Sequence, residues 1–103
     1  MRNYTFQELI ILGAYHFKYY RTYLKKQHFY QMNPIPLECT YAYSIQSSIE
    51  QLTQDERRIL MSEYIDCVEK NWWMDYFSKT SYYRIKRRAL SRFIDCLHNE
   101  IVV

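Results

Sequence analysis

Apolar residues in the first quarter of the chain recur with the period of a helix. From Phe6 to Leu24 they alternate spacings of four and three residues, and a second apolar stripe runs beside the first. Thr5 and Glu8 form a capping box at the start of this pattern, in which each side chain accepts a hydrogen bond from the backbone N–H of the other residue. The pattern predicts a long helix that begins after Thr5 and either packs on several neighbours or forms a homodimer seam. The first stripe comprises Phe6, Ile10, Gly13, Phe17, Tyr20 and Leu24, and the second Leu9, Leu12, Tyr19 and Tyr23.

A proline-containing segment follows this helix. Residues 30–40 include the tetrapeptide N-P-I-P, and proline disfavours helix in the residue before it, so we expect a connector. Apolar spacing after the connector predicts a short second helix with Tyr41, Ile45, Ile49 and Leu52 on one face. We therefore divide the chain into residues 1–40, which serve packing or oligomerisation, and residues 41–103, which form a compact helical unit.

The pattern beyond residue 52 has the order of a helix-turn-helix unit. Thr53 and Glu56 form a second capping box before a helix expected to run to about Val68. A short apolar helix is expected from Trp72 to Phe77, and Ser78 caps a last helix that reaches about Leu97. The expected fold is all-α, with a long N-terminal helix and a C-terminal helix-turn-helix. The inward positions of the last helix are expected to be Tyr82, Ile85, Ala89, Leu90, Phe93 and Cys96 or Leu97.

Composition supports one small helical domain and argues against several functions. The chain has 103 residues, of which 49% are apolar, with only one glycine and two prolines, too few for a fold rich in strands and turns. The three cysteines are isolated, which favours reduced, mostly buried thiols in a cytoplasmic protein and no metal site. No run is long and apolar enough to span a membrane. Because no acid–base pair, nucleophile triad or glycine-rich loop stands out, we expect neither an enzyme nor a cofactor.

Charge is segregated along the chain. The net charge of +3 combines a basic first segment (residues 1–30), an acidic middle (31–75) and a basic last segment (76–103). No acidic residue occurs from Tyr76 to Ile94. Such segregation favours a surface that faces a polyanion over an ordinary mixed-sign surface.

The outward face of the last helix is the candidate site for double-stranded DNA. Arginine makes bidentate hydrogen bonds to guanine or binds a phosphate. Hydroxyl groups hydrogen-bond to base edges or phosphates, and the N-terminus of a helix favours a phosphate. Lys86 and Arg92 are expected to contact the DNA backbone and thereby position the protein. Tyr82 is assigned to the core, and Tyr83 is undecided between core and DNA. The candidate DNA-binding residues are Lys79, Thr80, Ser81, Tyr83, Arg84, Lys86, Arg87, Arg88 and Arg92.

Residues from about 45 to 97 resemble sigma-factor region 4. The likeness is carried by Leu52, Asp55-Glu56-Arg57, Ile59-Leu60 and Tyr64, by Trp72-Trp73 with Phe77-Ser78, and by the run from Tyr82 to Leu90. Within that superfamily the segment is most similar to the ArpU- and RinA-type transcriptional regulators of phages and prophages. The resemblance implies a small DNA-binding regulator, typically of late phage genes. The family usually has a small residue and a glycine near the inter-helix turn, whereas residues 75–78 are bulky and lack glycine, which leaves the presentation of the last helix open.

Three other functions use the same expected fold. A sigma-like factor would contact RNA polymerase, with the acidic, tryptophan-containing middle segment as a suitable surface. A small terminase-like protein would recognise DNA for packaging. A protein–protein inhibitor would not touch nucleic acid. The sequence alone decides neither between these functions nor between activation and repression.

Overall fold

The computed structural model describes residues 3–30 and 36–102, and the side chains of residues 3–26 and 40–99. Its elements are α1 (Phe6–Tyr30), α2 (Pro36–Glu50), α3 (Gln54–Leu60), the π-helical turn η1 (Met61–Ile65), the 3-10 turn η2 (Trp72–Asp75) and α4 (Lys79–Val102). No strand occurs in these described ranges. The expected all-α class is confirmed.

Capping side chains begin three of the helices where the sequence predicts them. The Glu8 amide donates to Thr5 Oγ1 at 3.2 Å, and the Thr5 amide donates to Glu8 Oε1 at 2.9 Å. Thr53 and Glu56 form the same reciprocal pair at the start of α3. Ser78 Oγ accepts the Ser81 amide at 3.2 Å in the first turn of α4. Each cap satisfies a backbone N–H that has no partner within its helix.

The second helix begins earlier than predicted. Residues 36–40 were expected to belong to the connector, but α2 starts at Pro36. Proline is well tolerated at a first helical position, where its missing N–H would have had no intrahelical partner. The expected boundary at residue 40 therefore lies inside α2. The rest of the predicted connector includes residues 31–35, which lie outside the described part of the chain.

The segment between α3 and α4 also differs from the prediction. The regular α-helix α3 ends at Leu60, and the chain continues as the wider turn η1, which ends before Cys67. The φ of Cys67 is 51°, in the left-handed region. Val68, the expected end of this helix, lies beyond it and is exposed. The apolar run from Trp72 to Phe77 forms only the short turn η2, and the Asn71 side chain makes no capping hydrogen bond there. Helix α4 continues past the expected end at Leu97 to Val102.

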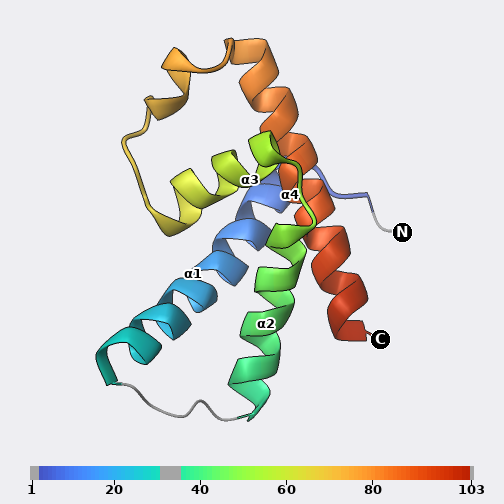
Figure 1. The fold of residues 1–103 in the computed structure, drawn as a ribbon. Helices are drawn as coiled ribbons and strands as arrows, with labels where there is room; N and C mark the ends of the chain where they lie inside the picture. The colour runs from blue at the N-terminus through green and yellow to red at the C-terminus, as the bar shows by residue number, and fades with distance from the viewer. Residues whose placement is uncertain (1–2, 31–35, 103) are drawn as a thin grey trace.

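Helix α4 runs along one side of the molecule and packs on α1, α2 and α3 (Figure 1). Its inward positions are those expected from the spacing, with Leu97 buried and Cys96 partly exposed. Phe17 of α1 lies fully buried between two rings, with centroids 5.2 Å from Tyr64 and 4.5 Å from Phe93. These stacked rings join α1, η1 and α4 in a single core.

Most of the apolar stripe on α1 is covered within the chain itself. Gly13, Phe17 and Tyr20 are buried, as is Tyr23 of the neighbouring stripe. A Cβ atom added at Gly13 would lie 2.7 Å from Leu90 Cδ2, so this glycine marks the close approach of α1 to α4. Leu24, at the end of the stripe, is exposed.

Candidate nucleic-acid interface

An exposed basic face covers the first half of α4. Thr80, Arg84 and Arg87 are spaced by four and three residues, so they share one side of the helix, and all are exposed. Lys79 is exposed in the first turn beside them. Among the residues whose side chains are described, Lys79, Arg84 and Arg87 make no side-chain hydrogen bond or ion pair. Their charges are therefore free to meet an anion.

Tyr83 borders this face and is partly held by other rings. Its ring lies edge-on to Phe6, with centroids 6.4 Å apart, and to Trp73, with centroids 6.2 Å apart. The residue is nevertheless exposed. The structure thus places Tyr83 at the edge between the core and the basic face. Tyr82, by contrast, is buried, as predicted, and stacks on Trp73 with centroids 4.3 Å apart.

Lys86 lies outside the exposed face, in an ion pair with η1. Its Nζ is 2.8 Å from Glu63 Oε1, and the two side chains are only 15% and 16% exposed. The other carboxylate oxygen of Glu63 accepts hydrogen bonds from Trp72 Nε1 at 3.1 Å and from the Tyr82 hydroxyl. Burial raises the pKa of Tyr82, and the hydrogen bond to Glu63 raises it further, so the phenol stays protonated as a donor.

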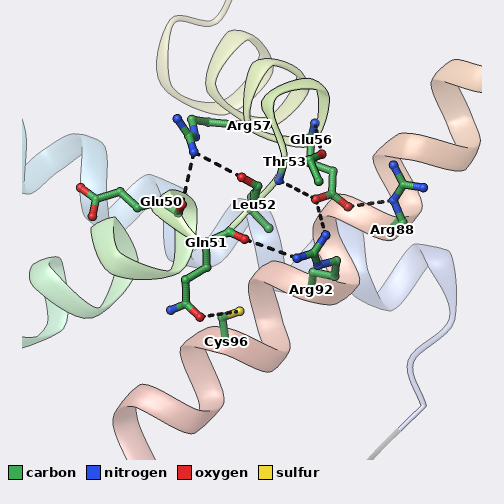
Figure 2. Close-up of polar contacts among 9 residues, drawn as sticks. All are labelled: Glu50, Gln51, Leu52, Thr53, Glu56, Arg57, Arg88, Arg92 and Cys96. Carbon is green, nitrogen blue, oxygen red and sulfur yellow. Dashed lines mark hydrogen bonds and ion pairs between the residues drawn. The ribbon is translucent and has the colours of Figure 1, made fainter.

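Arg88 and Arg92 converge on one buried carboxylate. Figure 2 shows Glu56, at the start of α3, pointing toward α4 between the two guanidinium groups. Arg88 Nε lies 2.8 Å from Glu56 Oε2, and Arg92 Nη1 lies 2.9 Å from Oε1. Glu56 is 0% exposed, whereas Arg88 and Arg92 are 51% and 45% exposed. Burial alone would raise the pKa of Glu56, but hydrogen bonds from Thr53 and Arg88 and the charge of Arg92 outweigh it and lower that pKa.

The same cluster fixes α4 against the turn between α2 and α3 (Figure 2). Arg92 Nη2 donates to the Gln51 carbonyl at 3.3 Å. Arg57 Nη2 donates to the carbonyl oxygens of Glu50 and Leu52, each at 3.2 Å, at the C-terminal end of α2. A cation at that end also complements the helix dipole.

The nine candidate DNA-binding residues thus fall into distinct groups. Lys79, Thr80, Arg84 and Arg87 form the exposed face, while Ser81 is half-buried in the first turn. Tyr83 stands at the edge, and Lys86, Arg88 and Arg92 are already paired with acids. Sequence reasoning missed the acidic partners Glu56 and Glu63. The spacing of four residues between Arg88 and Arg92, which places both on one side of the helix, was the available signal of a shared partner.

Other expectations concern cysteines, metals and membranes. Cys67 is exposed, so the prediction of mostly buried thiols is wrong for it; Cys39 lies outside the described side chains. The described residues contain no group of three or more histidine, cysteine, aspartate or glutamate side chains that could hold a metal ion. None of the helices in the described ranges is long and apolar enough to cross a membrane.

Comparison with known proteins identifies no relative of this chain. The chain matches no protein-family model, no curated protein and no solved structure.

Proposed function

We propose that the protein is a sequence-specific regulator of transcription that binds double-stranded DNA through the first half of α4. The observation that carries this proposal is the exposed face around Thr80, where Lys79, Arg84 and Arg87 have no ion-pair partner among the described side chains. An α-helix fits the major groove, where arginine distinguishes guanine by a bidentate contact. The resemblance to ArpU- and RinA-type regulators supports a role in phage or prophage transcription.

The acids nearest to α4 do not neutralise this face. Among the described side chains, Glu56 and Glu63 form ion pairs with α4, and their partners are Arg88, Arg92 and Lys86. Within that part of the chain, the exposed Lys79, Arg84 and Arg87 therefore have no acidic partner. An ordinary solvated helix face carries charges of both signs. This face instead concentrates positive charge in the N-terminal turns of α4, the part of a recognition helix that enters the major groove.

A salt titration with duplex DNA tests the proposal. Each phosphate neutralised by the protein releases condensed counterions, so the logarithm of the binding constant should fall linearly with that of salt concentration. Several phosphate contacts give a steep slope. A Lys25→Ala variant serves as the control, since Lys25 is exposed near the far end of α1 and should leave the slope unchanged. Absence of binding to any duplex at about 50 mM salt would refute the proposal.

Selection of bound genomic fragments then identifies the biological target. Fragments drawn from promoters support a regulator, whereas fragments clustered at a packaging site indicate a terminase-like role. Purification with RNA polymerase in the absence of DNA would instead indicate a sigma-like factor.

A further inference from the structure

We propose that Glu63 restrains DNA binding by holding Lys86 in an ion pair, so that Lys86 makes no phosphate contact in the wild-type protein. This inference rests on the proposed function, because it concerns the strength of the same interface. Lys86 lies between Arg84 and Arg87 in the sequence, and sequence analysis assigned it to the DNA backbone. Its ammonium instead lies 2.8 Å from a Glu63 carboxylate oxygen.

The carboxylate of Glu63 is fixed from several sides. Trp72 of η2 and Tyr82 of α4 donate to one oxygen, while Lys86 occupies the other. Lys86 Nζ also lies 5.8 Å from the centroid of the Tyr82 ring, which favours a cation in that place. Because the donors come from two separate elements, Glu63 cannot turn away without leaving polar groups unsatisfied.

A DNA phosphate and Glu63 would compete for the same ammonium group. Moving Lys86 to a phosphate would leave a carboxylate unpaired at a position where its side chain is only 16% exposed. Water screens such a partly buried pair less than a surface pair. Lys79, Arg84 and Arg87 have no such competing partner in the described structure, so they can engage phosphates or bases at no comparable cost.

Glu63→Gln is the decisive variant because it removes the charge and keeps the size and a hydrogen-bond acceptor. The released Lys86 should add about one phosphate contact, which steepens the salt slope by ~0.9 and raises affinity for random duplex DNA several-fold at about 50 mM salt. Glu69→Gln is the matched control. Glu69 lines the same open pocket of about 320 Å³ and loses the same charge, but it does not pair with Lys86. Its salt slope should stay unchanged.

Lys86→Gln completes a double-variant cycle and tests the inference even if Glu63→Gln fails to fold. In the wild-type background it should leave the salt slope unchanged, whereas in the Glu63→Gln background it should abolish the gain. A shallower slope for Lys86→Gln alone would show that Lys86 already contacts phosphate, which overturns the inference. An unchanged slope for a folded Glu63→Gln variant overturns it as well. If the wild-type protein binds no duplex, the proposed function itself has failed, which is a distinguishable result.

Discussion

The part of α4 up to Arg87 and the part from Arg88 onward carry similar basic side chains in different surroundings. In the first part, Arg84 and Arg87 are exposed and have no side-chain partner in the described structure. At the start of the second part, Arg88 and Arg92 share the buried Glu56. Beyond them, the helix is buried against the rest of the molecule through Phe93 and its neighbours.

This difference shows that an arginine of α4 is paired or available according to whether a neighbouring element brings an acidic side chain to it. Glu56 comes from α3, 32 and 36 residues away from its two partners, and brings a negative charge to only one part of α4. A buried carboxylate is stable only when paired, so Arg88 and Arg92 are required by the fold. Where no acid approaches, the same guanidinium group remains available for an anion. The two parts of α4 can therefore be tested separately.

The largest expected effect comes from removing Glu56. Glu56→Ala leaves two arginines without their partner and also breaks the capping box of α3. Because both arginines are partly exposed and can rehydrate, we expect a loss of about 2–4 kcal/mol in the free energy of unfolding. Urea denaturation measures it. Asp55→Ala, an exposed first-turn change in the same helix, should cost less than about 1 kcal/mol. Equal losses for the two variants would contradict a special role for Glu56.

The ion pairs of Glu56 with Arg88 and Arg92 also make the stability of the wild-type protein sensitive to acid. Because the pKa of Glu56 is lower in the folded than in the unfolded chain, its stabilisation is complete above the unfolded pKa of about 4.3. It is lost as pH falls through the lower folded value. The Glu56→Ala variant should lack this part of the pH dependence of unfolding.

The next largest effect concerns DNA binding by the first half of α4. Arg84→Ala or Arg87→Ala should weaken specific binding by ~1–3 kcal/mol if the side chain reads a base. Each change should leave the unfolding free energy nearly unchanged, because neither arginine has a side-chain partner among the described residues. Binding measured against operator and random duplexes separates base reading from phosphate contact. If sequence preference survives in both variants, these arginines do not read bases.

The local parts of the fold could be predicted from the sequence. The caps at Thr5, Thr53 and Ser78 depend on residues within one helical turn, and the buried side of α4 follows from helical spacing alone. The region between α3 and α4 could not be predicted in the same way. Its course depends on the left-handed Cys67 and on contacts such as that between Trp72 and Glu63, which join separate elements. Proline at the start of α2 was misjudged because it can begin a helix as well as end one.

The candidate site was predictable as a charged face but not residue by residue. A run of basic residues shows where positive charge lies along one helix. It does not show which acids approach from elements 23 or more residues away, as Glu63 approaches Lys86 and Glu56 approaches Arg88. These pairings arise only when tertiary packing brings the elements together. The structure therefore narrows the unpaired cations of α4 to Lys79, Arg84 and Arg87 within the described residues.

A smaller effect is expected where the middle of α4 meets α1. Gly13→Ala places a Cβ 2.7 Å from Leu90 Cδ2 in a fully buried environment. Overpacking costs about 1–3 kcal/mol, which the better helix propensity of alanine offsets by about 1 kcal/mol, so we expect a net loss of about 1 kcal/mol. In a Leu90→Val background the clashing atom is absent and the same change should be neutral or stabilising. A stabilising Gly13→Ala in the wild-type background would show that the two helices can separate freely.

The smallest effect is a pH dependence at the same junction. His16 of α1 contacts the Phe93 ring and the Tyr41 hydroxyl, and burial lowers its pKa from the ordinary value of 6.5. The unfolded chain therefore binds more protons than the folded chain just below pH 6.5, so the contribution of His16 to stability is complete above that pH and declines as pH falls. Unfolding free energies measured at several pH values between about 7.5 and 5.5 should show this decline. It should be reduced in His16→Gln and retained in His98→Gln, whose histidine is exposed. An equal decline in both variants would mean that His16 is protonated as readily in the fold as in the unfolded chain.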